Sequence, residues 1–151
     1  MIPRPSHFRV RSYELDSLGH LNHAVFLNYF EQARFDTLEQ VGISPSGLES
    51  RGWGVHVVRV EVDFRRECRQ GDALIVRTEV ESMRNSSMVL RQIMERESSG
   101  EGVAEARVVA VWVRSGKGPM RIPEEVRTSL NSIRLNSIRE SDRPPPSEHP
   151  S

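Results

Sequence analysis

The sequence predicts an α+β domain in which one long helix packs against an antiparallel sheet of five strands. Residues 22–41 are mostly apolar, and their polar positions recur every three or four residues, which is the period of a helix. One segment before this helix and four segments after it alternate apolar and polar residues, as strands do when one face is buried. This order favours a sheet with one face packed on the helix.

The first strand and the long helix are expected on either side of a short polar loop. The strand covers residues 7–13. Asn22 is a suitable N-cap for the helix. We expect the helix to continue to about Val41, and Gly42 suits the position just after a helix end. The helix is apolar enough that we expect burial on most of its circumference.

Four more strands are expected after a loop rich in Gly, Ser and Pro at 44–54. They cover 54–66, 73–81, 87–97 and 103–114. In the first of them the alternation changes phase near Val57, which predicts a β-bulge. One face of the last strand carries three alanines, which leave room for a close helix. That face consists of Ala104, Ala106, Val108, Ala110 and Trp112. The opposite face is rich in valine, and a second subunit could cover part of it.

The C-terminal end is expected to be a short helix followed by a tail. The helix covers residues 124–130. From residue 131 onward the chain has a duplicated Asn-Ser-Ile-Arg, three consecutive prolines and scattered charges. Such a composition is typical of segments that do not pack. We therefore predict one domain over residues 1–130 and a flexible C-terminal tail over 131–151.

Bulk composition excludes several classes of function. The 151-residue chain has 21 basic and 21 acidic residues, so its zero net charge gives no support for nucleic-acid binding. The single cysteine rules out an internal disulfide. No apolar run reaches the roughly 18 residues of a membrane span. The N-terminal segment lacks the apolar core of a signal peptide. We therefore expect a cytoplasmic protein.

Asp16 is the candidate catalytic residue, because it lies between the first strand and the start of the long helix. In this layout the carboxylate can be aimed at a reacting carbonyl. Free N–H groups near His23 and Ala24, at the helix N-terminus, can stabilise the oxyanion that forms there. Hydrolysis at a carbonyl carbon needs these two parts, an activated water or covalent acyl group and a stabilised oxyanion. The alternative is that Asp16 only caps the turn that follows it.

Three neighbours of Asp16 are further candidates, each with a plainer alternative. His23 could polarise the reacting carbonyl or orient water through its imidazole, or it is an ordinary residue of the first helical turn. Asn22 is expected to cap the helix and to fix the loop that carries Asp16. His20 could contact the substrate or simply pack against the domain.

Arginines supply the candidate phosphate contacts. Arg65 and Arg66 lie where a strand approaches a turn, and they could bind a phosphate group of a substrate. The alternative is a solvated strand end. Arg34 lies beside the apolar face of the long helix and can pair with Glu31. For Arg34 a structural role is favoured over substrate binding.

Other hydrolytic and cofactor chemistries lack their motifs. The serine-hydrolase pattern Gly-x-Ser-x-Gly is absent, and so is a Gly-rich phosphate loop. The histidines do not have the spacing of metal ligands, so we expect no metal and no cofactor. Cys68 and His56 stand near opposite ends of one expected strand, and nothing orients them as a catalytic pair.

Three blocks of the sequence resemble hotdog-fold thioesterases. The group includes long-chain acyl-CoA thioesterases, the 4-hydroxybenzoyl-CoA thioesterase family and plant-type acyl-carrier-protein thioesterases. The first block is Tyr13-x-x-Asp16-x-x-x-His20-x-Asn22 and continues through Tyr29, Glu31, Ala33 and Arg34. The second is Phe64-Arg65-Arg66 with Gly71-Asp72, and the third is Ala110-Val111-Trp112 with Arg121-Ile122-Pro123. Three spaced blocks in order are far more specific than any one of them.

The resemblance implies a hotdog fold, in which a five-stranded antiparallel sheet wraps a central helix. It also implies hydrolysis of acyl-CoA or acyl-carrier-protein thioesters, with Asp16 as nucleophile or general base. The phosphate that Arg65 and Arg66 could bind would then belong to coenzyme A or to a phosphopantetheine arm. A homodimer or homotetramer with the acyl tunnel at the subunit interface is expected on the same ground. His23 has features of two branches of the family. It replaces the second Asn of a His-x-Asn-Asn start, and it stands seven residues after Asp16, where another branch has a His.

Two alternatives stay open within this fold. One is a module that binds acyl thioesters without turnover, and the acid at position 16 favours turnover over this alternative. The other is hydration of enoyl thioesters, whose branch places its Asp and His in a different motif context, early on the helix. Binding of acyl-CoA without release of thiol would favour the binding module.

Overall fold

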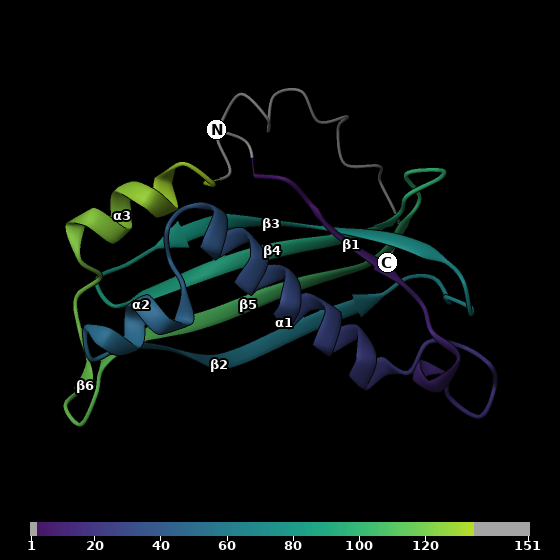
Figure 1. Cartoon of the computed structure of the whole chain (residues 1–151), viewed down its shortest axis with the longest axis horizontal. Helices are drawn as coiled ribbons and strands as arrows, with labels where there is room; N and C mark the ends of the chain where they lie inside the picture. The colour runs from purple at the N-terminus through teal and green to yellow at the C-terminus, as the bar shows by residue number, and fades with distance from the viewer. Residues whose placement is uncertain (1–2, 135–151) are drawn as a thin grey trace, which may run out of the picture.

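A curled antiparallel sheet wraps one long helix in the computed structural model, which describes residues 3–134 (Figure 1). The strands lie in the order β1-β3-β4-β5-β2, with β6 beside β5 and every neighbouring pair antiparallel. Their bounds are β1 (Ser6–Arg9), β2 (Trp53–Phe64), β3 (Ala73–Met83), β4 (Ser87–Arg96), β5 (Gly102–Arg114) and β6 (Gly118–Pro119). The helices are α1 (His23–Gln40), α2 (Pro45–Ser50) and α3 (Glu124–Asn131). The predicted α+β hotdog architecture is confirmed, with the two-residue β6 as an addition.

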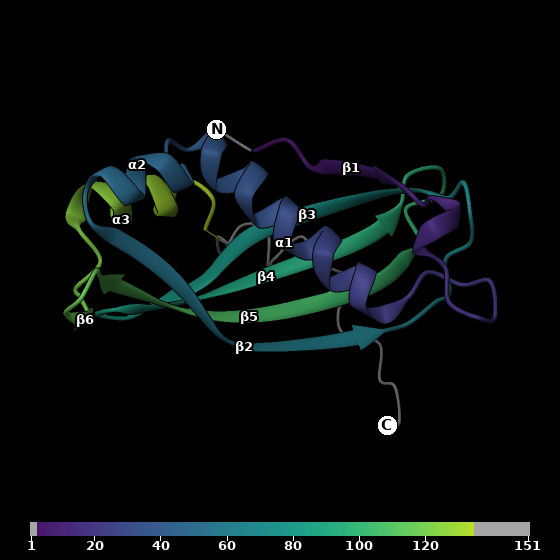
Figure 2. The same cartoon turned by 60° about the horizontal axis from the view of Figure 1, so that its bottom comes forward.

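Helix α1 crosses the concave face of the sheet, as the two views in Figures 1 and 2 agree. Asn22 caps it, because its side-chain Oδ1 accepts the Ala24 N–H at 2.8 Å. Gly42, with φ 86°, follows its end. The prediction of burial on most of the circumference is wrong for the single chain. Leu27 and Phe35 are 43% and 44% exposed, so one side of α1 has no cover within the described residues.

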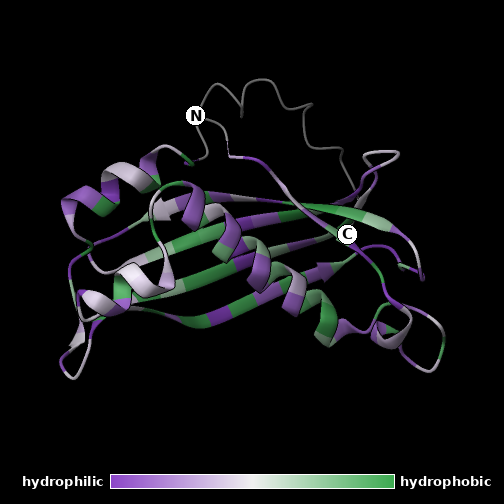
Figure 3. Cartoon of the chain, viewed as in Figure 1, coloured by the Kyte–Doolittle hydropathy of each residue, from purple (hydrophilic) through white to green (hydrophobic). Residues whose placement is uncertain are grey.

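The core lies between α1 and the inner face of the sheet, where Figure 3 shows hydrophobic residues along the central strands. Alternate residues of β3 and of β5 are buried on this inner face. They are Leu74, Val76, Thr78 and Val80 on β3, and Ala104, Ala106, Val108, Ala110 and Trp112 on β5. The backbone of α1 comes nearest to β3 and β1 rather than to the three alanines of β5. Burial of the apolar surface between the helix and the sheet drives folding.

Two expected segments have more structure than the sequence pattern predicted. The first strand ends at Arg9, and a 3-10 helix, η1 (Ser12–Glu14), follows it. This turn forms because Glu14 Oε1 accepts the Arg11 N–H at 2.9 Å. The expected loop at 44–54 contains α2, which Ser44 caps through Gly47 N–H and which Pro45 begins.

Strand β2 is an edge of the sheet and carries the predicted bulge. Its register with β5 shifts between Val57 and Arg59. Along this edge Val58 is 61% exposed and Val60 is 40% exposed. An exposed apolar edge strand is a surface that another chain can pair with.

The first residues of the expected tail are docked on the domain. Ile133 is buried, and its carbonyl accepts the Val80 N–H at 2.9 Å. Arg134 forms a parallel bridge with Val80. The rest of the expected tail, 135–151, lies outside the described residues. No helix within residues 3–134 combines the length and the apolar character that crossing a membrane requires.

Candidate active site

Asp16 begins a tight turn between η1 and α1, and one of its carboxylate oxygens holds that turn together. Oδ1 accepts the N–H of Leu18 at 2.9 Å and the N–H of His20 at 3.0 Å. The main chain closes the same turn, because Asp16 N–H donates to the His20 carbonyl at 2.7 Å. Within residues 3–134, Oδ2 has no hydrogen-bond partner. Asp16 therefore caps the turn with one oxygen, and its other oxygen stays available.

The same hydrogen bonds keep Asp16 ionised. The His20 N–H is the largest influence on its pKa, and together with the Leu18 N–H it holds the pKa of Asp16 below the usual value against the opposing effect of burial. The charges of the His20 and His23 rings act in the same direction. A carboxylate is thus available across the neutral pH range, as a nucleophile or a general base requires.

A buried acid that the sequence analysis missed anchors this turn to the helix. Glu14 Oε1 accepts the Tyr29 O–H at 2.6 Å, and the Glu14 carbonyl accepts the Asn22 N–H at 2.9 Å. Burial and the adjacent Glu14 carboxylate raise the pKa of Tyr29, so its hydroxyl stays a donor. Phe8 stacks on the Tyr29 ring at 4.5 Å between centroids. No sequence pattern could have indicated this contact, because Glu14 and Tyr29 are fifteen residues apart in the chain.

The start of α1 offers one open backbone donor. The Ala24 N–H, one of the two predicted oxyanion donors, donates to Asn22 Oδ1 at 2.8 Å. The other, the His23 N–H, has no acceptor within residues 3–134. Asn22 is therefore confirmed as the helix cap, and the same hydrogen bond competes with the predicted role of Ala24.

The His23 side chain joins the helix start to the end of the edge strand. Its ring stacks on Phe64 with centroids 4.2 Å apart, and Phe26 meets Phe64 edge-on at 5.1 Å. Within the described residues His23 makes no hydrogen bond with Asp16. The ring is exposed, so it stands at the rim of the site, where its predicted catalytic role stays a prediction.

His20 and the predicted phosphate-binding arginines lie on the same side of the domain. His20 Nε2 is 3.1 Å from Glu67 Oε2, so the turn of Asp16 touches the segment after β2. Arg65 pairs with Glu105 at 3.2 Å, and Arg66 pairs with Glu101 at 3.0 Å. An open hollow beside them is lined by Arg65, Arg66, Glu67, Arg69, Asp72 and Arg96. Four cations against two anions make its lining basic, although glutamates already pair with Arg65 and Arg66.

A cavity of about 780 Å³ lies at the other end of α1, and the sequence analysis did not anticipate it. It opens between the C-terminal half of α1, α2, β2 and the inner face of the sheet. Its walls are mostly apolar. They include Leu38, Ile43, Leu48, Trp53, Leu90 and Val108. Asp16 does not line this cavity, because it precedes the opposite end of the helix.

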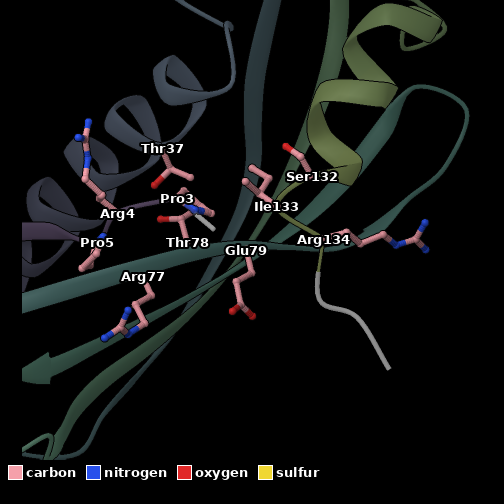
Figure 4. A pocket seen from close by; sticks show the side chains of 10 residues that line it. All are labelled: Pro3, Arg4, Pro5, Thr37, Arg77, Thr78, Glu79, Ser132, Ile133 and Arg134. Atoms are coloured by element: carbon pink, nitrogen blue, oxygen red, sulfur yellow. The ribbon is translucent and has the colours of Figure 1, made fainter. Parts of the chain in front are cut away.

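The remaining features lack catalytic geometry. Cys68 is fully buried, and burial raises the pKa of its thiol to about 11, so it is a poor nucleophile. The described residues contain no group of His, Cys, Asp and Glu side chains that could hold a metal ion. A small hollow of about 100 Å³ lies beside Ile133, and Figure 4 shows the side chains that line it. Around it Arg4, Arg77 and Arg134 point away from one another.

The chain is similar in sequence to known proteins. Residues 10–130 match the family model of the thioesterase-like superfamily. The chain is 28% identical over 122 residues to the chloroplastic acyl-acyl carrier protein thioesterase ATL3 of Arabidopsis thaliana. The aligned region covers 81% of this chain and 64% of ATL3. It therefore spans less than two thirds of that relative's length. It is 30% identical over 105 residues to the long-chain acyl-CoA thioesterase FadM of Escherichia coli, covering 70% of this chain and 79% of FadM.

Solved structures agree with this assignment. A crystal structure of a thioesterase from Thermus thermophilus, complexed with coenzyme A and Zn, has a TM-score of 0.75 to this chain at 32% identity. The superposition covers 87% of this chain and 94% of that one. Sequence blocks, sheet topology and these matches all lead to one conclusion: the chain belongs to the thioesterase-like superfamily and has its hotdog fold.

Proposed function

We propose that this chain hydrolyses acyl thioesters of coenzyme A or of acyl carrier protein to a free acid and a thiol. The observation that carries the proposal is Asp16, an ionised carboxylate with one oxygen fixed in a turn and the other free, just before a helix N-terminus. The thioesterases named above, FadM and ATL3, support the same chemistry.

Asp16 can act in two ways, as a general base or as a nucleophile. As a general base, Oδ2 takes a proton from water while the water oxygen attacks the thioester carbon. As a nucleophile, Oδ2 attacks that carbon itself to form a mixed anhydride, which water then hydrolyses. In both cases the C–S bond breaks as the tetrahedral intermediate collapses, and the thiolate leaves and takes up a proton.

The oxyanion is proposed to form against the start of α1. The His23 N–H is the open donor, and the positive end of the helix dipole favours the developing charge. The Ala24 N–H can contribute only if the oxyanion displaces Asn22 Oδ1 as its acceptor, or if both oxygens accept from it. Asn22 thus positions the helix start, and the His23 ring on Phe64 forms one rim of the site.

We also propose that two copies pair through the β2 edge, and that the site is completed between them. In an antiparallel two-fold pairing, the Phe64 end of one β2 lies beside the Trp53 end of the other. His23 stacks on Phe64, and Trp53 lines the large cavity. The turn of Asp16 in one copy would then face the cavity of the other, which would hold the acyl chain. A homotetramer stays a prediction.

The basic hollow near Arg65 and Arg66 suits the thiol carrier. The contact between His20 and Glu67 keeps this hollow on the side of the Asp16 turn. Coenzyme A and the phosphopantetheine arm of a carrier protein both present phosphate there, and arginine binds phosphate well. The hollow therefore supports either carrier.

One observation favours the alternative of a binding module without turnover. The hydrogen bond from Ala24 N–H to Asn22 leaves a single open oxyanion donor. Loss of one such donor typically lowers a rate by ~10²–10³-fold. A protein of this kind would bind acyl-CoA and release no thiol.

The deciding measurement is thiol release from short, long and aromatic acyl-CoAs by the wild type and by Asp16→Asn. Asparagine keeps an oxygen for the Leu18 and His20 N–H groups, so the turn survives while the carboxylate is lost. We expect a fall of about 100-fold or more. Glu39→Gln, a change at an exposed position on α1, is the matched control and should leave activity unchanged. Equal activity in wild type and Asp16→Asn would overturn the mechanism.

A further inference from the structure

Arg34 reaches from α1 into the space between the helix and the sheet, where it meets a fixed acceptor. Its Nη1 donates to Gln92 Oε1 at 3.0 Å. Gln92 is fully buried, and its Nε2 donates to the Phe30 carbonyl at 2.8 Å and to Thr78 Oγ1 at 2.9 Å. Because both amide protons of Gln92 are used, its oxygen stays directed at Arg34.

Most of the hydrogen-bonding capacity of Arg34 is unused. A guanidinium has five N–H donors, and within residues 3–134 only the bond to Gln92 engages one of them. No carboxylate of the described residues lies within ion-pair distance of Arg34. Burial lowers the pKa of Arg34, and the charge of Glu31 only partly opposes this effect. A half-buried cation with so few partners is unfavourable unless something else accepts its hydrogen bonds.

The unused donors face the large cavity, which Arg34 lines. The other polar lining residues, Glu31, Glu49, His56 and Ser115, are all exposed and so belong to its mouth. The inner walls are apolar apart from Arg34. An acyl chain that fills this cavity therefore removes water from the guanidinium and must replace it.

We propose that Arg34 selects acyl groups that carry an uncharged oxygen, a hydroxyl or a keto group, over plain hydrocarbon chains. This inference rests on the proposed function, in which the cavity holds the acyl chain. A plain chain would dehydrate Arg34 without giving it an acceptor, whereas an oxygen on the chain would accept one of its N–H groups. A hydrogen bond to a charged group corresponds to about 10- to 100-fold in selectivity.

The charges around the cavity favour a neutral oxygen over a carboxylate. Glu31 and Glu49 contribute two negative charges to the lining and Arg34 contributes one positive charge, so these three side chains sum to minus one. A carboxylate on the acyl chain would add a second unbalanced negative charge. A hydroxyl or keto oxygen accepts the hydrogen bond and adds none.

The test compares kcat/KM for acyl-CoAs of one chain length that are unsubstituted, hydroxylated at successive carbons, keto-substituted or ω-carboxylated. For the wild type we expect a preference of about 10- to 100-fold for at least one hydroxyl or keto position over the plain chain. Arg34→Met should abolish the preference, mainly by improving the plain substrate, and Arg34→Lys should keep part of it. Arg77→Met is the control, because Arg77 pairs with Glu95 away from this cavity and should not alter the preference.

Three results would overturn the inference: no preference at any position, an unchanged preference in Arg34→Met, or a preference for the ω-carboxylate. If Arg34 only braces Gln92, Arg34→Met lowers turnover of all substrates equally. Should Arg34→Met fail to fold, Arg34→Gln, which keeps an N–H donor toward Gln92 but loses the charge, replaces it.

A binding measurement separates this inference from the proposed hydrolysis. Calorimetric titration with the same plain and hydroxylated acyl-CoAs needs no turnover. If no thioester is cleaved but the hydroxylated ligand binds the wild type more tightly, and the difference disappears in Arg34→Met, the inference holds and hydrolysis fails. Equal affinities for both ligands would overturn the inference whether or not thiol is released.

Discussion

The two ends of α1 are built by different interactions. At the N-terminal end, hydrogen bonds between residues two to four positions apart fix a polar turn. Leu18 and His20 donate to Asp16, and Ala24 donates to Asn22. At the C-terminal end, α2, β2 and the sheet enclose an apolar cavity around Arg34. The first end is fixed locally and carries the proposed chemistry. The second depends on contacts between distant segments and carries the proposed selectivity.

This difference means that reactivity and selectivity can be changed separately. A substitution in the turn should affect all acyl groups alike, because it alters the reacting atoms. A substitution in the cavity should change the order of preference among acyl groups and leave the reacting atoms untouched.

The largest expected effect is the loss of activity when Asp16 is protonated. An imidazole base would lose activity as the pH falls through about 6.5. Because the turn lowers the pKa of Asp16, kcat/KM should instead stay level from pH 7 to well below that value. The acid limb should appear only below about 3.9, the ordinary value for Asp. A pH profile of thiol release measures this. An acid limb near pH 6.5 would mean that a histidine, rather than Asp16, is the essential base.

The stability of the turn follows the same pKa with a definite sign. A carboxyl group whose pKa is lowered in the folded state stabilises that state above its unfolded pKa, and this contribution is lost as the pH falls through the lower folded value. Asp16 thus stabilises the fold throughout the level part of the profile. Urea unfolding of the wild type and Asp16→Asn should differ at pH 6 and converge at acid pH.

A smaller effect is expected from filling the cavity. Leu48→Trp places an indole against the cavity wall and should lower kcat/KM for long acyl chains by ~10-fold or more, while short chains are nearly unaffected. Kinetics over a series of chain lengths would show this as a shift of the optimum. A uniform decrease at every length would mean that the cavity does not hold the acyl chain.

Mixing two variants tests whether one site uses both copies. In a dimer of Asp16→Asn with Leu48→Trp, the intact Asp16 of one copy faces the intact cavity of the other. Random exchange should then restore about a quarter of the wild-type sites for long-chain substrates. If each site lies within one chain, mixing restores nothing beyond the average of the two variants.

The sequence predicted the features that short-range patterns determine better than those that depend on contacts between distant segments. Asn22 as the cap, Gly42 after the helix and the bulge near Val57 all follow from short-range patterns, and the structure confirms them. The cavity could not be predicted, because its walls come from segments more than fifty residues apart. Glu14 was missed for a related reason, since its burial depends on Tyr29 across the turn.

The smallest expected effect concerns Asn22, whose cap joins stability to the oxyanion site. Asn22→Ala should destabilise the protein by about 1 kcal/mol, as measured by urea unfolding, because the cap is lost. It also frees the Ala24 N–H. If that group serves as a second oxyanion donor, kcat per folded molecule should stay level or rise, whereas Asn22→Asp, which keeps a capping oxygen, should not show the gain. A fall in kcat in both variants would mean that Asn22 itself, and not the freed Ala24 N–H, supports the reaction.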